Sequence, residues 1–359
     1  MPRIFSKIFS PGAEYFIKRE TGVMKKYENI FTNPQVTEKI SQIENSPQMQ
    51  EKLAAIKADM KSKTSNPFLV GIFFVFSIIV LLEYTHPFLS NIYENLSSLQ
   101  SSPYYLYLIL IPVFFIGRPI YEKFTANKAD VKNSYINNFL TPVLEEIFPG
   151  TTLNYSEGLS LEVCDSLLPN SNHYQGNCHI VFADELRTEF SNMYAFHYIR
   201  NSKGEREESI DFIGQVFLVR LKTGVNGHLR VVPVKEKVWM GKKTYGVYGG
   251  RRKDEEEIQT ESLAFNDGYS IFATDDFYSK LILDPQVIEI FNSWMKKMDV
   301  ALYMNAEYIA LAFQSSRYLF SVPTTKGEVE NLSLAGEYEK VRDKLADFYE
   351  LVAAVAEKI

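Results

Sequence analysis

The sequence predicts an α+β fold made of an N-terminal helix, a two-helix transmembrane hairpin and a mostly antiparallel cytoplasmic α+β domain closed by a long C-terminal helix. Two observations predict it. Two strongly apolar runs lie in the first third of the chain, and short runs rich in β-branched and aromatic residues follow them, ending in a helical repeat. We divide the chain into a cytoplasmic N-terminal segment (1–66), the hairpin (67–121), a helical connector (122–150) and the α+β domain (151–359).

The N-terminal segment is predicted to contain an amphipathic helix that leads into the first apolar run. Ser46 followed by Pro47 is typical of an N-cap and a first-turn proline. Apolar residues then recur every three or four positions, at Met49, Leu53, Ile56 and Met60.

The two apolar runs are predicted to span a membrane at about residues 67–84 and 103–121. Each is apolar on every helical face and nearly reaches the ~20 residues that cross a bilayer. The loop from Glu83 to Ser102 contains no Lys or Arg, whereas the outer flanks of both runs are basic. Because positive flanks stay inside, we expect a multi-pass inner-membrane protein with both termini cytoplasmic.

The rest of the chain has the pattern of a helix, an antiparallel sheet and further helices. Residues 128–147 have helical spacing and stop at Pro149 and Gly150. The following runs, CHIVFAD, YAFHYIR, GQVFLVRLKT, LRVVPV, TYGVYG and YSIFAT, predict strands. Turn residues at 201–204, 224–227 and 266–268 predict hairpins between them. Thr274 and Asp284 are expected to begin helices, and ALYM, IALAF and RYLFSV return to strand.

Composition excludes some classes of function. The chain has a net charge of −6, and its acidic excess lies after the hairpin. Nucleic-acid binding needs a basic face, so no nucleic-acid partner is expected. The two cysteines, Cys164 and Cys178, fall in the predicted cytoplasmic domain, where packed thiols are expected in place of a disulfide.

No motif predicts a catalytic residue, a cofactor or a metal. Asp275 and Asp276 follow Thr274 at a predicted helix start, where carboxylates complement the helix dipole. The segment 241–244 lacks the first glycine of a phosphate loop. A possible zinc cluster has none of the usual ligand spacings, and it would comprise Cys164, His173, Cys178, His179 and His197.

A basic, aromatic-rich hairpin is a candidate contact with lipid headgroups or a protein partner. The alternative is a solvated hairpin whose charge is neutralised by the acidic run 254–257. The basic residues of this hairpin are Lys235, Lys237, Lys242, Lys243, Arg251, Arg252 and Lys253.

The C-terminal helix carries apolar residues at alternating spacings of four and three. This repeat predicts a packing seam, either on the domain's own sheet or, as in a coiled coil, against a second copy in a homo-oligomer. The seam consists of Leu334, Tyr338, Val341, Leu345, Phe348, Val352, Val355 and Ile359.

The segment LAFNDGYSIFATDDFYSKLILDPQVIEIF resembles the best-marked part of a bacterial membrane-anchored family, domain-of-unknown-function family 3137. The matching positions are Phe265, Tyr269, Ile271, Asp275, Ser279, Lys280, Leu283 and Pro285, with Phe212, Gly214 and Phe217 in an earlier strand. The resemblance implies membrane spans near the N-terminus and an α+β cytoplasmic domain. It implies no catalytic residue, and it suggests a LemA-type membrane protein as a partner.

Taken together, these features predict a membrane-anchored cytoplasmic interaction module that binds a protein partner or inner-leaflet lipid. The alternative is a membrane-tethered enzyme whose site is assembled from scattered residues. The lack of a dense polar motif favours the interaction module.

Overall fold

A computed structural model describes residues 31–64, 129–201, 204–221, 225–237, 243–295 and 297–356. The chain divides into two compact units. The described parts of the first, the sheet unit, lie within 31–41, 143–321 and 335–356. Those of the second, the helical unit, lie within 42–64, 129–142 and 322–334.

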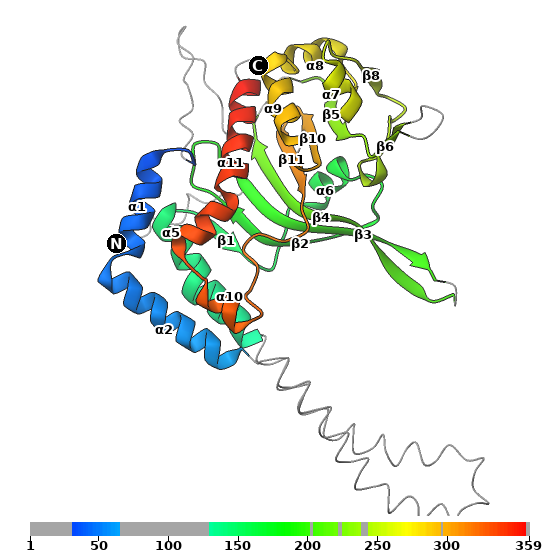
Figure 1. The fold of residues 1–359 in the computed structure, drawn as a ribbon. Helices are drawn as coiled ribbons and strands as arrows, with labels where there is room; N and C mark the ends of the chain where they lie inside the picture. Colours follow the sequence, from blue (N-terminus) through cyan, green and yellow to red (C-terminus); the bar gives the residue numbers. More distant parts are fainter. Residues whose placement is uncertain are drawn as a thin grey trace, which may run out of the picture. The chain divides into compact units, whose positions relative to one another are not determined.

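A nine-stranded antiparallel sheet forms the centre of the sheet unit (Figure 1), in the order β1-β2-β3-β4-β11-β10-β5-β9-β8. A short hairpin of β6 and β7 is separate from it. The strands are β1 (Thr152–Asn154), β2 (His173–Val181), β3 (Glu189–Arg200), β4 (Arg206–Arg220), β5 (His228–Pro233), β6 (Glu236–Lys237), β7 (Lys243–Thr244), β8 (Glu256–Ile258), β9 (Tyr269–Ala273), β10 (Val300–Asn305) and β11 (Tyr308–Gln314).

Helices cover both faces of the central strands, which explains why those strands are apolar along their whole length. Successive side chains of a strand point to opposite faces. The Phe217 ring of β4 lies 5.6 Å from that of Phe348 in α11, whereas Val216 and Leu218 belong to a cluster with α6. The helices are α1 (Pro34–Glu44), α5 (Thr141–Ile147), α6 (Leu161–Leu167), α7 (Leu263–Gly268), α8 (Asp276–Ile282), α9 (Pro285–Met295) and α11 (Leu334–Ala356), with a 3-10 turn η2 (Gly246–Tyr248).

The β3–β4 hairpin extends beyond its neighbouring strands (Figure 1). Pairing of β3 with β2 ends at Phe196, and pairing of β4 with β11 ends at Gly214. Beyond these points the two strands pair only with each other, out to Arg200 and Arg206. This part therefore has two strand edges with which no other described strand pairs.

The helical unit contains α2 (Pro47–Lys63), a π-helix η1 (Tyr135–Leu140) and α10 (Lys326–Glu330). The Ser46 hydroxyl accepts a hydrogen bond from the Met49 N–H, so Ser46 is the predicted N-cap of α2. Within this unit, Lys61 of α2 forms an ion pair of 2.6 Å with Glu330 of α10.

The predicted transmembrane hairpin is not supported. Within the described ranges, no helix combines the length and the apolar character needed to cross a membrane. The longest of them, α11, has 23 residues but carries charged side chains along its length, because it buries one face against protein. The predicted spans at 67–84 and 103–121 lie outside the described residues.

The assignments that depended on the hairpin are corrected with it. These are the membrane-protein class, the multi-pass inner-membrane location and the cytoplasmic placement of both termini. What the structure does show is a mixed α+β protein with a large antiparallel sheet.

Candidate functional site

The predicted basic hairpin is partly engaged in contacts within the sheet unit. Lys235 forms an ion pair with Asp299 and donates to the Gln314 side chain at 2.8 Å. Lys243 donates to the carbonyl of Asn266 at 2.9 Å. For Lys237 only the backbone is described, and Lys242 lies outside the described residues.

The other three basic residues of this hairpin lie in the loop between η2 and β8. Arg251 and Lys253 are exposed, and Arg252 is half-buried. The Arg252 backbone N–H donates to Glu255 at 2.6 Å. Of the basic residues predicted to form the patch, Lys235 and Lys243 therefore bind other side chains or carbonyls of the sheet unit. The other three whose side chains are described lie in a loop whose backbone Glu255 binds.

Glu255 belongs to a buried charge cluster that no sequence motif predicts. Its carboxylate accepts two hydrogen bonds from Arg230, at 2.9 and 3.0 Å, and lies 2.8 Å from His228 Nε2. Arg230 also donates to the carbonyls of Tyr248 and Gly249. Burial alone would raise the Glu255 pKa, but the hydrogen bonds outweigh it and lower the pKa to about 2. The cluster fastens the loop onto β5.

The residues of the predicted C-terminal seam are buried. Phe348 packs on Phe217 of the sheet, and Lys344, on the same helix, donates to the Gln215 side chain. Ile359 lies outside the described residues. The buried seam residues are Leu334, Tyr338, Val341, Leu345, Phe348, Val352 and Val355.

The cysteines and histidines do not assemble into a metal site. Cys164 and Cys178 are buried free thiols, as predicted, and burial raises the pKa of Cys164 to about 11. No group of three His, Cys, Asp or Glu that could hold a metal occurs in the part of the chain that the structure describes.

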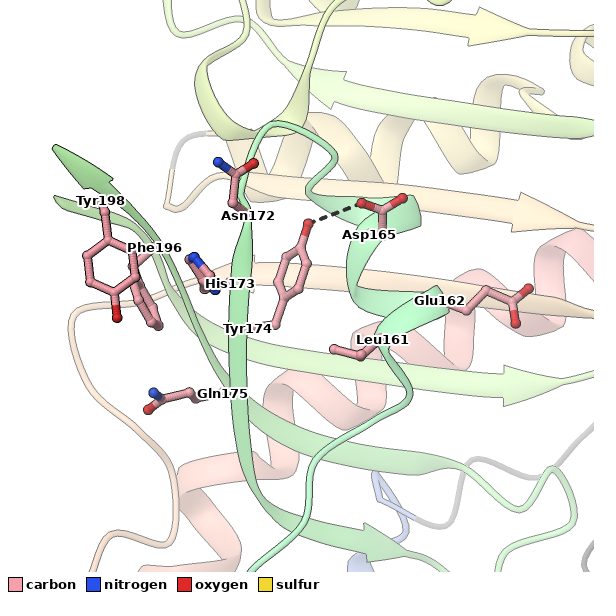
Figure 2. Close-up of a pocket in the computed structure, with 9 residues that line it drawn as sticks. All are labelled: Leu161, Glu162, Asp165, Asn172, His173, Tyr174, Gln175, Phe196 and Tyr198. Atoms are coloured by element: carbon pink, nitrogen blue, oxygen red, sulfur yellow. Dashed lines mark hydrogen bonds between the residues drawn. The ribbon is translucent and has the colours of Figure 1, made fainter. Parts of the chain in front are cut away.

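The candidate site of this structure is an open groove of about 720 Å³ between α6 and the start of β2. This volume lies within the range typical of ligand pockets. Figure 2 shows its two sides, with His173 and Gln175 on one side of strand β2 and Tyr174 on the other. The remaining lining residues are Leu161, Glu162, Asp165, Asn172, Phe196 and Tyr198.

In the described part of the chain, one edge of β2 is unpaired where it borders this groove. The short strand β1 pairs only with residues 179–181 of β2. The loop before α6 crosses next to it, so closely that a Cβ added at Gly158 would lie 2.5 Å from the Cα of Gly176. No strand among the described residues pairs with this edge at His173, Tyr174 and Gln175. The groove occupies the place where a neighbouring strand would lie.

Aromatic rings form one wall of the groove. His173 stacks on Phe196, with ring centroids 5.1 Å apart, and contacts the edge of Tyr198 at 5.0 Å. The guanidinium of Arg206 lies 3.8 Å from the Tyr198 ring centroid. Tyr198 is nevertheless 38% exposed, so this wall offers apolar surface to a ligand.

The opposite wall combines an exposed leucine with two carboxylates. Leu161 is 69% exposed, and Glu162 and Asp165 are exposed on the same helix. The Tyr174 hydroxyl lies 3.4 Å from Asp165 and 2.7 Å from the carbonyl of Leu168. Tyr174 thus ties the strand to α6. Figure 2 shows Asp165 pointing toward Tyr174 and Glu162 pointing away from β2, so Asp165 is the carboxylate on the strand side of α6.

A hydrogen-bonded trio lies next to the groove. Asp211 lies 2.7 Å from His197 Nδ1, and it accepts from the Ser171 hydroxyl at 2.8 Å. In nucleophilic hydrolases the histidine lies between the serine and the carboxylate. Here the carboxylate lies between the other two, which positions the start of β2 against β3 and β4 and does not activate the serine.

The groove could not be predicted from the sequence, because its residues carry no motif. The strand predicted from CHIVFAD begins at Cys178, whereas β2 begins at His173. The added residues HYQGN are mostly polar and do not alternate in hydrophobicity, so their pattern predicts no strand. Pro169 and Asn170 just before them are the one local signal of a turn into a strand.

The fold and the groove define a mixed α+β protein with an open strand edge, and part of the chain is similar to a known family. Residues 210–356 match the family model described as "Protein of unknown function (DUF3137)", which confirms the predicted resemblance over that part of the chain. The lining residues of the groove all precede this matched part.

One solved structure is similar to the chain, the crystal structure of the mycobacterial trehalose monomycolate transport factor A, TtfA. The similarity covers 59% of this chain and 92% of that chain, with 8% sequence identity and a TM-score of 0.31. A likeness of this size carries no argument about function. No curated protein matches the chain.

Proposed function

We propose that this protein is an interaction module that binds a peptide segment of a partner protein in the groove between α6 and β2. The observation that carries the proposal is the unpaired edge of β2 facing an exposed leucine across an open groove. Unpaired strand edges are usually shielded, and an accessible one beside apolar side chains is a template for pairing with another chain.

Exposed apolar surface around the groove supports the same proposal. Besides Leu161 and Tyr198, Ile199 and Ile210 of the projecting β3–β4 hairpin are 43% and 58% exposed. Isolated apolar residues on a surface are common, but here Leu161 and Tyr198 line a concave site, which is typical of a binding site, and the two isoleucines lie outside it on the hairpin.

The test is selection from a displayed library of random 12-residue peptides on the full-length protein. The groove variant is Leu161→Arg, which places a large charged side chain in the site. Leu263→Arg is the matched control, because Leu263 is 82% exposed on α7 and does not line the groove.

We expect selected peptides to bind the wild type and the control equally, and the groove variant at least about tenfold more weakly, as for loss of a central apolar contact. Failure to enrich any peptide contradicts the proposal. So does enrichment of peptides that bind both variants as well as they bind the wild type.

A further inference from the structure

We infer that the ligand of this groove is an extended, basic segment that adds to the free edge of β2 as a further strand. This inference rests on the proposed function and specifies both the chemistry of the partner and its mode of binding.

The position of the groove favours an extended ligand. Its lining residues include three consecutive residues of one strand, and they project alternately to its two sides (Figure 2). A peptide paired along this edge would also place its side chains alternately on the two faces of the sheet. Those on one face would meet His173 and Tyr198, and those on the other would meet α6.

The backbone of the edge supplies the affinity of this mode. A strand edge presents alternate N–H and C=O groups, and a paired peptide satisfies them through main-chain hydrogen bonds that do not depend on its sequence. The Gly158–Gly176 crossing closes the edge beyond Gln175. An added strand therefore pairs with a short stretch, and its side chains must supply specificity.

Charge complementarity identifies those side chains. On the α6 wall, Glu162 and Asp165 are exposed, and the described basic groups at the groove, His173 and the Arg206 guanidinium on Tyr198, lie on the other wall. A lysine or arginine of the ligand could lay its aliphatic stem on Leu161 and direct its charge to Asp165, the carboxylate on the strand side of α6, with Glu162 adding to the negative potential of the helix (Figure 2). On the other wall, the rings of His173 and Tyr198 favour an apolar side chain. The ligand is therefore an alternation of basic and apolar residues.

The experiment measures binding of a fluorescent pentapeptide, Val-Lys-Val-Lys-Val, to the full-length protein by anisotropy. Three matched peptides accompany it: one with Glu in place of Lys, one N-methylated at both lysines, and one N-methylated at the second and third valines. In a paired strand alternate amides face the edge, so only one of the two N-methylated peptides loses hydrogen bonds to β2.

We expect the Lys peptide to bind at least about tenfold more tightly than the Glu peptide, and less tightly as salt is raised. One N-methylated peptide is expected to bind about tenfold more weakly, and the other within about threefold of the parent. On the protein, Glu162→Gln with Asp165→Asn should remove most of the preference for Lys over Glu. Asp254→Asn with Glu256→Gln, two exposed residues just before and at the start of β8 and outside the groove, should leave it unchanged.

The outcomes separate this inference from the proposed function. If library peptides bind the groove but the two N-methylated peptides bind alike, strand addition is wrong and the binding module stands. If the Glu peptide binds as tightly as the Lys peptide, the basic character of the partner is wrong. If the Lys peptide and the library peptides all fail to bind, both proposals fail.

Discussion

Two histidine–carboxylate pairs in the sheet unit have the same short contact but different surroundings. His228 and Glu255 lie 2.8 Å apart with the glutamate side chain fully buried, and Arg230 completes the charge balance. His197 and Asp211 lie 2.7 Å apart next to the groove, where the histidine side chain is 37% exposed. The buried pair fixes a loop to the sheet, whereas the exposed pair borders the proposed binding site and can be altered at a lower cost in stability.

The largest effect that we expect is from Arg230→Met. The substitution keeps most of the side-chain volume but leaves Glu255 buried without its charged partner, which should cost about 3–5 kcal/mol of unfolding free energy. Denaturant unfolding of the full-length protein measures it. Arg220→Met is the control, since that arginine side chain is 58% exposed and its ion pair with Glu189 should contribute about 1 kcal/mol or less. Equal losses in the two variants would show that the buried cluster has no special role.

The second largest effect that we expect is a loss of unfolding free energy at acid pH, when Glu255 becomes protonated. The pKa of Glu255 is about 2 in the folded protein, against 4.5 for a glutamate without these contacts. A carboxyl with a lowered folded pKa stabilises the protein above its unfolded pKa, and this stability is lost as pH falls from about 4.5 toward 2. Unfolding free energies measured at several pH values should therefore fall more steeply for the wild type than for Glu255→Gln. Parallel curves would contradict the assignment.

Asp211→Ala tests the exposed pair from its carboxylate side. It removes the acceptor of both Ser171 and His197, and we expect a loss of about 2 kcal/mol, smaller than that for Arg230→Met. Thermal unfolding of the full-length protein, compared with the exposed control Asp254→Ala, measures this difference. A loss as large as that for Arg230→Met would show that the exposed pair stabilises the fold as much as the buried cluster does.

The smallest expected effect is that of His197→Gln. Because this histidine is partly exposed, its contact with Asp211 should contribute about 1 kcal/mol or less. Hydrogen exchange should locate the change, with faster exchange at the projecting end of β3 and β4 and unchanged exchange in β5. Faster exchange in β5 would show that the two pairs are coupled.

The sequence predicts regular elements well where a pattern dominates. Asp284 accepts from the Val287 N–H at the start of α9, as expected of a cap, and β5, β9, β10 and β11 coincide with apolar runs. A neighbouring cap was misplaced. Asp275, and not Thr274, accepts from the Phe277 N–H, because the Thr274 hydroxyl accepts from the His228 N–H.

Elements held by distant side chains could not be predicted. RYLFSV has the composition of a strand, but residues 317–322 lie outside the sheet. The Gln215 amide donates to the carbonyl of Arg317, and Asn192 donates to that of Leu319. Phe320 adopts a φ of 53°, which no strand contains. The groove was missed for a related reason, since its defining property is a missing strand partner and not a residue pattern.

The close contact between Gly158 and Gly176 sets the length of β2 edge that is open to a ligand. Neither position leaves room for a Cβ, so the loop before α6 stays at a fixed point along β2 and limits how far an incoming chain can extend. At about 3.3 Å per residue, the three open positions before this stop span roughly 10 Å. A side chain at either glycine would displace the stop and change the length of ligand that fits, without altering any residue that lines the groove.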